Sequence, residues 1–379
     1  MAWLREQNLS ADAVIDAVQF FLDGEGCNAT FEGEYGNDEY HVFRVSFSDR
    51  PSVCLRVEHP RGHRVPGGED ERAICARLEG ERRAYERLGA VDFHWSMRLF
   101  GASLGFDNPI GYPYMVLDFA GENRLRWSDE SPGEPARSAL LARLAGIQLQ
   151  LIQRTLETRE MTAYEFFKQK IECRLESIRQ GNLPELVEQD VLDQLALLPE
   201  VLGDEKDNRQ FAMEHGDLRA ESIISGSHFN IEAIVDWGSA EMVPVAQAAR
   251  FPPLLSCCES ADDSPSGQML RDRAAYTAAV ACAAARPQPA LPYPGEGYED
   301  GSRAAALAAM RHAVVAGRRG LGAAVRHAPR GLDGLAARGG RGGRAARAPP
   351  PPEGVGGDDD NIYSCYCDDA DDYYSCYTT

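Results

Sequence analysis

Apolar and polar positions along the first part of the chain change from the spacing of a helix to that of a strand. Residues 1–26 repeat apolar side chains every three or four positions, which predicts an amphipathic helical region. From Cys27 to Val57 the repeat shortens to two. Residues 40–47 and 52–57 both alternate, and the polar residues 48–51 between them favour a turn, so this segment predicts a β-hairpin.

Residues 69–235 are predicted to be predominantly helical. Residues 69–88 have a helical repeat that ends before Gly89, and the apolar run 112–119 reads as a buried strand. Three further helices and then two short strands are predicted at residues 137–155, 163–179, 186–198, 222–225 and 231–235. Strands first and helices later predict an α+β protein with a sheet-rich first lobe.

The composition changes beyond residue 260. Residues 271–284 and 302–326 are rich in Ala and Arg and are compatible with helices. From about residue 329 onward, Arg–Gly repeats, four prolines and an Asp/Tyr/Cys tail predict disorder. Ten arginines lie between residues 303 and 347. Such a basic segment could touch RNA, but an unstructured appendage or an error in the gene model is the preferred interpretation.

The overall composition narrows the classes of function. With 44% hydrophobic residues the chain can bury a real core, and its formal net charge of −20 argues against wrapping nucleic acid or lying on an anionic membrane. The same charge is compatible with a cationic substrate. The first ten residues contain no apolar run, and the ten cysteines are scattered, so we expect reduced thiols, no secretory signal and a cytoplasmic protein.

Two segments contain the residues best suited to chemistry. His215, Gly216 and Asp217 form the first, and the second is an apolar strand that ends in Asp236 and Trp237. Two carboxylates at this spacing can serve one phosphoryl transfer, because that reaction needs positioning and charge neutralisation more than covalent chemistry. An unrelated surface turn and edge strand would give the same letters, so the pair matters more than either segment alone.

These segments resemble the catalytic loop H-G-D-x-x-x-x-N and the metal-binding I-D-W of the aminoglycoside phosphotransferase family. The resemblance implies that Asp217 orients the acceptor hydroxyl and takes its proton, that Asp236 holds Mg²⁺ on the phosphates of ATP, and that His215 braces the loop. Ser222 stands where the family has Asn as the ligand of a second metal ion. A hydroxyl is a poorer ligand than an amide oxygen, so a nucleotide-binding pseudokinase or scaffold without turnover is the alternative.

Upstream residues test the resemblance independently. Residues 53–56 resemble the V-A-I-K strand of kinases, with Arg56 in place of the Lys that grips the α- and β-phosphates. Cys54 and Arg56 share one face of that strand. Glu81 falls on the apolar stripe of the following helix, so it needs a buried partner, and Arg56 is the candidate. The alternatives are a solvated arginine and a frayed helix end.

Two weaker features complete the order found in kinases. Gly33 and Gly36 lie where kinases have their phosphate-covering loop, although a simple turn would read the same. The run that ends near Asp118 and Ala120 resembles the hinge whose backbone groups meet adenine, although a buried strand without a ligand would also fit. The H-G-D triplet and the absence of an A-P-E triplet after Gly238 disfavour a protein kinase.

The resemblance covers residues 25–255, with a possible extension to 328, and residues 236–252 resemble fungal-type members. It implies a two-lobed protein-kinase-like fold with an N-terminal lobe of residues 1–118, a helical lobe of residues 119–328 and a tail of residues 329–379. The implied activity is transfer of the γ-phosphate of ATP to a hydroxyl of a small molecule. The sequence does not name that molecule.

Overall fold

The computed structural model describes residues 2–22, 28–36, 40–58, 71–183, 186–255 and 265–285. The described residues form two compact units. The first consists of the described residues up to Glu160 and those after Asn208, and the second of residues 161–208. The predicted helix at 302–326 and the predicted tail from residue 329 lie outside the described residues.

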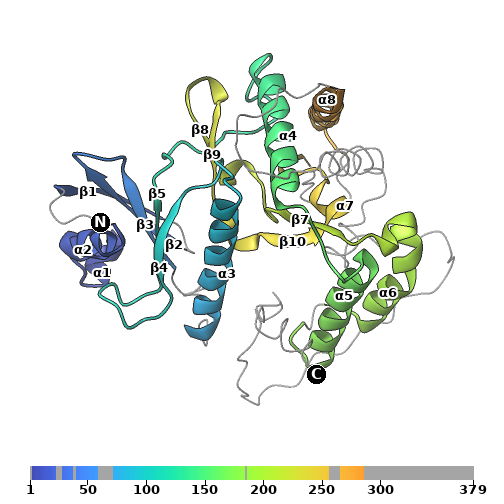
Figure 1. Cartoon of the computed structure of the whole chain (residues 1–379), viewed down its shortest axis with the longest axis horizontal. Helices are drawn as coiled ribbons and strands as arrows, with labels where there is room; N and C mark the ends of the chain where they lie inside the picture. Colours follow the sequence, from blue (N-terminus) through green and yellow to red (C-terminus); the bar gives the residue numbers. More distant parts are fainter. Residues whose placement is uncertain are drawn as a thin grey trace, which may run out of the picture. The chain divides into compact units, whose positions relative to one another are not determined.

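A five-stranded antiparallel sheet opens the first unit (Figure 1). Its strands stand in the order β1-β2-β3-β5-β4. Their bounds are β1 Ala29–Gly36, β2 Tyr40–Phe47, β3 Val53–Glu58, β4 Leu99–Ser103 and β5 Tyr114–Asp118. The predicted hairpin is confirmed as β2 and β3, which pair from Tyr40 opposite Glu58 to Val45 opposite Val53. Strand β4 has no clear alternation in the sequence and was not predicted.

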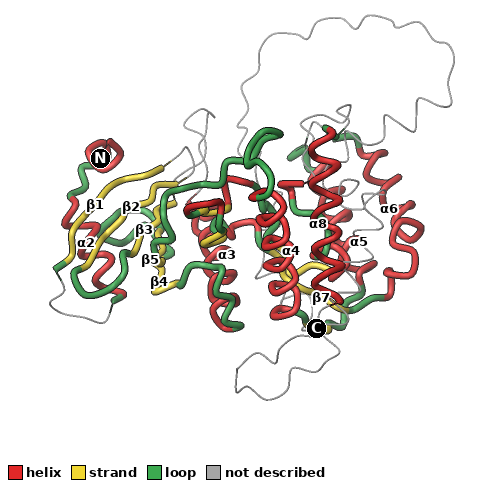
Figure 2. The backbone as a smooth tube through the Cα atoms, turned by 90° about the horizontal axis from the view of Figure 1, so that it is seen from above, coloured by secondary structure: helices red, strands yellow, loops and turns green. Residues whose placement is uncertain are grey.

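The two faces of strand β3 have different neighbours. Val53, Leu55 and Val57 belong to an apolar core that they share with helix α2 (Ala11–Phe21). Figure 2 shows α2 beside strands β1 and β2. The alternate residues of β3, among them Arg56, are also buried, on the opposite face. A strand that is buried on both faces can therefore hold charged side chains away from water.

Helix α3 (Glu71–Ala90) covers most of the predicted helix 69–88. Its buried residues recur every three or four positions, as the sequence predicts for one face of a helix. They are Ile74, Leu78, Glu81, Ala84, Tyr85 and Leu88. The predicted burial of Glu81 on this stripe is confirmed, with 1% of its surface exposed.

Helices and two small sheets make up the rest of the first unit. The predicted strands at 222–225 and 231–235 are confirmed as the hairpin of β8 (Ile223–Ser225) and β9 (Ile231–Ile234). The other sheet has the order β10-β7-β6, and the sequence did not predict its strands. The remaining elements are α1 Ala2–Glu6, α4 Ala136–Thr155, β6 Glu157–Thr158, β7 Gln210–Glu214, β10 Glu241–Pro244, α7 Val245–Ala248 and α8 Gly267–Ala285.

The second unit is a helical pair, α5 (Ala163–Arg179) and α6 (Glu188–Leu202). Thr162 begins α5 with a capping box, because its hydroxyl accepts the Glu165 N–H while the Glu165 carboxylate accepts the Thr162 N–H. The α+β class and the order of strands before helices are thus confirmed. None of the described helices combines the length and apolarity that a membrane crossing requires.

Candidate active site

His215 joins the loop after β7 to the end of β9. Its Nε2–H donates to the carbonyl oxygen of Val235 at 2.9 Å, and its Nδ1 accepts the N–H of Asp217 at 3.3 Å. These two bonds require the neutral tautomer with the proton on Nε2. Burial lowers the pKa of His215, which favours the same neutral form. The imidazole therefore holds Asp217 next to the segment that leads to Asp236.

Gly216 lets this loop lie directly against the backbone after Asp236. Its φ of +82° is in the region that favours glycine. A Cβ at this position would lie 2.0 Å from the carbonyl oxygen of Ser239. The H-G-D triplet therefore contains a glycine that both the backbone conformation and the close approach require.

Asp236 follows β9 in a left-handed backbone conformation, with φ +66° and ψ +62°. Trp237 next to it is buried, donates its indole N–H to the carbonyl of Ile234 at 3.0 Å and packs against His215 with 4.6 Å between ring centroids. The Asp236 carboxylate is 42% exposed. A buried anchor and a strained turn therefore present one carboxylate to solvent.

Arg56 brings the predicted ion pair and Asp236 together. Its guanidinium is ion-paired with Glu81, and its Nη2 lies 3.5 Å from Oδ1 of Asp236. The guanidinium also lies over the ring of Tyr40, 4.5 Å from the centroid. Residues from β3, α3 and the end of β9 thus converge, although 180 positions separate Arg56 from Asp236 in the numbering.

Sequence reasoning missed two members of this cluster, Glu58 and Arg77. Oε1 of Glu58 lies 2.9 Å from Nη1 of Arg56, and its Oε2 lies 3.1 Å from both Nε and Nη2 of Arg77. A signal was present, because Glu58 is two residues from Arg56 on the strand and Arg77 is one helical turn from Glu81. This signal is weak, because exposed Glu and Arg are common at strand ends and on helices.

Burial controls the charges in this cluster. It raises the pKa of Glu81 to about 7, with the Asp236 and Glu58 carboxylates adding to the rise and Arg56 opposing it. Burial alone would lower the pKa of Arg56, but its three carboxylate neighbours outweigh it and keep the guanidinium charged. Oε1 of Glu81 is buried and has no hydrogen-bond partner among the described residues. The cluster holds three acids and two arginines.

The loop after Asp217 is closed by Ser222. The Ser222 hydroxyl donates to the carbonyl oxygen of Asp217 at 3.0 Å and is buried. The side chain of Asp217 is 45% exposed and accepts a bond from Nε of Arg219 at 2.5 Å. Ser222 therefore braces the loop by donating its hydroxyl hydrogen. The lone pairs on its oxygen remain available to a metal ion.

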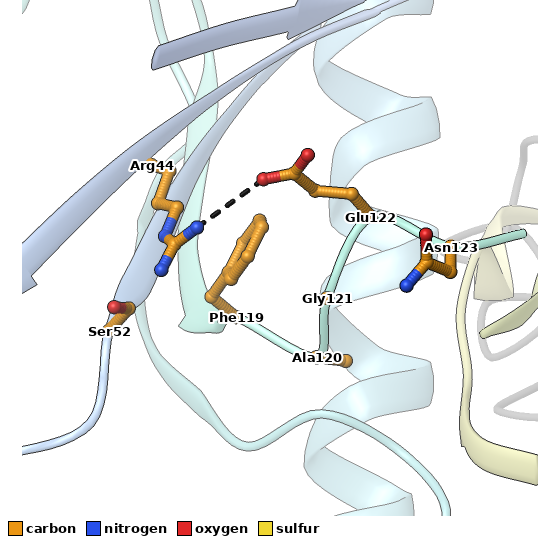
Figure 3. A pocket seen from close by; sticks show the side chains of 7 residues that line it. All are labelled: Arg44, Ser52, Phe119, Ala120, Gly121, Glu122 and Asn123. Atoms are coloured by element: carbon orange, nitrogen blue, oxygen red, sulfur yellow. Dashed lines mark hydrogen bonds and ion pairs between the residues drawn. The ribbon is translucent and has the colours of Figure 1, made fainter. Parts of the chain in front are cut away.

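A pocket of about 400 Å³ lies at the segment after β5 (Figure 3). Figure 3 shows the Arg44 guanidinium beside the Phe119 ring and directed toward Glu122. Arg44 lies 4.7 Å from the ring centroid, and its Nη1 is 3.3 Å from Oε1 of Glu122. The same oxygen accepts the hydroxyl of Tyr35 at 2.5 Å. The lining residues are Arg44, Ser52, Phe119, Ala120, Gly121, Glu122 and Asn123.

The predicted hinge residues lie at this pocket or next to it. The N–H of Asp118 donates to the carbonyl of Arg98 at 3.0 Å, and its own carbonyl faces the thiol of Cys54 at 3.6 Å. Within the described residues, the N–H of Ala120 makes no hydrogen bond. Ala120 also packs against a small apolar cluster that includes Ile224 and Val235. Sequence reasoning did not single out Ile224, whose apolar strand reads like any core strand.

Gly33 and Gly36, which the sequence placed at a phosphate-covering loop or a simple turn, lie in a strand. Both belong to strand β1, and Gly33 lies where the pairing register with β2 shifts. A Cβ on Gly33 would lie 3.2 Å from the hydroxyl of Tyr35, so the glycine leaves space for that side chain. The simple turn that the sequence left open at these two glycines is not formed there, because both lie in a strand and a β-bulge marks Gly33. Residues 37–39 lie outside the described residues.

The donor set near Asp236 fits one magnesium ion held together with phosphates. No group of three or more His, Cys, Asp or Glu side chains in the described segments is placed to hold a metal ion. Mg²⁺ in nucleotide enzymes commonly takes one or two protein ligands and completes its shell with phosphate oxygens and water. The exposed carboxylate of Asp236 fits that pattern, and the Ser222 oxygen is the nearest analogue of the second ligand of the family motif.

No protein-family model matches the chain, and no curated protein matches it. Among solved structures, a Ralstonia eutropha JMP134 protein described as an aminoglycoside phosphotransferase is 14% identical, with 84% of this chain and 93% of that chain covered and a TM-score of 0.49. A Plasmodium vivax ethanolamine kinase is 11% identical, with 88% and 85% covered and a TM-score of 0.45. The macrolide 2'-phosphotransferase of Brachybacterium faecium is 16% identical, with 87% and 94% covered and a TM-score of 0.40. All three TM-scores are below 0.5.

Proposed function

We propose that this protein is a small-molecule kinase of the aminoglycoside phosphotransferase type, which transfers the γ-phosphate of ATP to a hydroxyl group. One observation carries the proposal. Arg56 is paired with the buried Glu81 and at the same time faces Asp236, which comes from a distant part of the chain. A cation held by a buried acid beside an exposed carboxylate is the arrangement that binds a metal-bound triphosphate in kinases.

The nucleotide base would occupy the pocket beside the hinge. The N–H of Ala120, which makes no hydrogen bond to any described residue, is available to an acceptor nitrogen of adenine, and Ile224 and Val235 offer an apolar surface to the ring. Cys54 lies on the same face of β3 as Arg56, two residues away. A base near Cys54 would therefore direct its phosphates toward Arg56 and Asp236. The boundary that we propose between the two lobes, at residues 118–119, falls in this hinge.

The phosphates would be held by charge. Arg56 would donate to the phosphate oxygens through Nη2, the nitrogen that faces Asp236. Asp236 and Ser222 are the residues that would hold Mg²⁺. When bound, the metal supplies positive charge against the phosphate oxygens during transfer. Gly33 and Gly36 in β1 are the residues that we propose to approach the phosphates, and residues 37–39 after them lie outside the described segments.

Asp217 is the proposed catalytic residue for the acceptor. Its carboxylate is partly exposed, and Arg219, His215 and Ser222 fix its loop through hydrogen bonds to the side chain, the N–H and the carbonyl. It would orient the acceptor hydroxyl and accept its proton as the bond to phosphorus forms. Such a general base contributes about 10²- to 10⁴-fold to the rate.

An ATP-consumption assay over a panel of amino sugars, amino alcohols and neutral sugars tests the proposal. We expect at least one compound to stimulate ADP formation with Mg²⁺, and the Asp217→Asn variant to lose that stimulation by about 100-fold or more. The protein's net charge of −20 favours the cationic members of the panel. A stimulation that persists unchanged in the variant would contradict the proposed role of Asp217.

Nucleotide binding without turnover is the second candidate function, and the contact of Ser222 favours it. The Ser222 hydroxyl donates a hydrogen bond to the Asp217 carbonyl, so it braces the loop as the family's asparagine would. Its oxygen is a weaker ligand for a metal ion than the amide oxygen of asparagine. Ser222→Asn discriminates between the two functions. An increase in turnover with a lower Mg²⁺ requirement would show a weakened kinase, whereas Mg²⁺-dependent ATP binding with no turnover in either form would show a pseudokinase.

A further inference from the structure

A second ion pair, in which Glu58 is buried and Arg77 is partly exposed, lies directly beside Arg56 and Glu81, and the proposed chemistry does not use it. Glu58 is 2% exposed and divides its two oxygens between two arginines. Oε1 lies 2.9 Å from Nη1 of Arg56, while Oε2 lies 3.1 Å from Nε and from Nη2 of Arg77. A carboxylate buried to this degree is costly unless it is paired, so these contacts are required rather than incidental.

The four side chains form two crosswise pairs between one strand and one helix. Strand β3 provides Arg56 and Glu58, which share a face because they are two residues apart. Helix α3 provides Arg77 and Glu81, which share a face because they are one turn apart. The strand cation meets the helix acid, and the strand acid meets the helix cation. The contact between Glu58 and Arg56 joins the two pairs.

The joined pairs restrict how the guanidinium of Arg56 can rotate. Nη1 is held by Glu58 and by Glu81, which leaves Nη2 as the terminal nitrogen that faces Asp236, at 3.5 Å. A lysine at this position would be a point charge, and a single glutamate would orient it. An arginine is a planar fork, and its phosphate-binding edge depends on which side of the fork is already occupied.

We infer that Glu58, held in place by Arg77, is a positioning residue that turns the Nη2 edge of Arg56, which faces Asp236, toward the phosphates of the nucleotide. The inference rests on the proposed nucleotide site and adds a residue pair to it that the family motifs do not contain. It also explains why an arginine can stand at this position. The second carboxylate on the strand fixes the additional rotational freedom of the planar group.

Paired binding measurements test the inference. Glu58→Gln keeps the size of the side chain but removes the charge that holds Nη1 and Arg77. We expect the affinity for the Mg²⁺ complex of a non-hydrolysable ATP analogue to fall about 10-fold, the effect of one charge-assisted hydrogen bond. Adenosine has no phosphates, and its affinity, measured by ligand-detected NMR, should change by less than about 2-fold. A variant that was merely loosened would lose both ligands alike.

Two further variants keep the test informative. Glu58→Gln with Arg77→Gln removes the pair without leaving an unpaired buried charge, so it should fold better than Glu58→Gln alone and show the same phosphate-specific loss. Glu79→Gln is the matched control. It makes the same chemical change on α3, where Glu79 bonds only Arg82 and Arg83 in the described chain, and it should leave both affinities unchanged.

The outcomes distinguish a failure of the proposed kinase function from a failure of the positioning role of Glu58. If the unaltered protein binds neither the ATP analogue nor adenosine, the proposed function is wrong and the inference fails with it. If the unaltered protein binds both, and the double variant either matches it or loses both ligands equally, the kinase proposal stands and the positioning role of Glu58 is refuted.

Discussion

Gly216 is the residue whose backbone most tightly limits substitution in the candidate site. Its φ is +82°, and the atom that a side chain would add there would lie 2.0 Å from the Ser239 carbonyl oxygen. The loop that carries Asp217 and the loop that follows Asp236 can approach each other only because this side chain is missing. The distance between the proposed base and the proposed metal ligand therefore depends on the absence of a Cβ at Gly216.

We therefore expect Gly216→Ala to destabilise the protein by about 1–3 kcal/mol and to abolish Mg²⁺-dependent turnover, because the two loops must move apart. Urea unfolding and the ATP assay measure the two effects. Gly80→Ala is the control, since Gly80 lies inside α3 with no atom near its added Cβ. That change should stabilise the protein by about 0.5–1 kcal/mol. Equal behaviour of the two variants would contradict the close approach at Gly216.

Glu81 provides a prediction for pH at the same scale. Burial raises its pKa to about 7 from an ordinary value of 4.5, so the folded protein binds this proton more tightly than the unfolded chain does. The stabilisation from Glu81 is therefore complete below about pH 4.5 and is lost as the pH rises through about 7. The Glu81→Gln variant has no ionisable group at this position, so its stability lacks this pH dependence.

Urea unfolding of the unaltered protein and Glu81→Gln should be compared from pH 5 to pH 8. The free energy of unfolding of the unaltered protein should fall relative to that of the variant across this range, by up to about 3 kcal/mol. Groups that titrate elsewhere cancel in the difference. A constant difference over the whole range would show that Arg56 keeps Glu81 ionised throughout.

At the scale of elements, the site depends on what each face of a strand touches. Strand β3 directs Val53, Leu55 and Val57 toward the core shared with α2, and it directs Arg56 and Glu58 toward α3. Strand β1 acts in another way. It carries Tyr35, whose hydroxyl reaches across to Glu122 in the segment after β5. The pocket at the hinge is thus bordered by contacts between elements that are not neighbours in the sequence.

Tyr35→Phe should weaken nucleotide binding by about 2- to 10-fold, because it removes one hydrogen bond to Glu122 while leaving the ring in place. Calorimetry with the ATP analogue measures the change. Tyr112→Phe is the matched control. It removes the hydrogen bond from Tyr112 to Gln7, 3.2 Å long, in the core on the α2 side of the sheet. We expect the control to affect stability only, and a comparable loss of affinity in both variants would argue against a specific role for Tyr35.

At the scale of the whole molecule, distant parts of the first unit are fastened by a buried ion pair. Arg137 at the start of α4 donates from Nε and Nη2 to the two oxygens of Asp272 in α8, at 2.7 and 2.6 Å. Both residues are 2% exposed, and the guanidinium also lies over the ring of Trp127. This bidentate pair joins residues 135 positions apart and fixes the last described helix.

Breaking this pair from one side should be severe. Asp272→Asn leaves Arg137 as an uncompensated buried charge and should cost about 3–5 kcal/mol in urea unfolding. Arg137→Met with Asp272→Leu removes both charges and should cost clearly less than the single change. Nucleotide affinity, measured below the unfolding transition, should be unchanged in the double variant because neither residue contacts the candidate site. A larger cost for the double change would contradict an electrostatic origin.

The sequence by itself determined the longer elements and the principal chemical groups. Its spacing of apolar residues gave the hairpin, α3 and the helices, because burial on one face imposes a period on any regular element. The motif residues Asp217 and Asp236 could be recognised because their spacing is local. The burial of Glu81 could be predicted because its stripe runs along one helix, and Arg56 followed as the partner that such burial requires.

Only the tertiary structure decided which side chains meet. The pairing of Glu58 with Arg77, the hydrogen bond from Tyr35 to Glu122 and the packing of Ala120 against Ile224 all depend on contacts between separate elements. Strands β4, β7 and β10 were missed for a related reason, since short strands in mixed surroundings carry little period of their own. The sequence left open whether Gly33 belongs to a phosphate-covering loop or to a simple turn, because a glycine shows only that a side chain is absent. The packing around Gly33 decides that this space serves a bulge of β1.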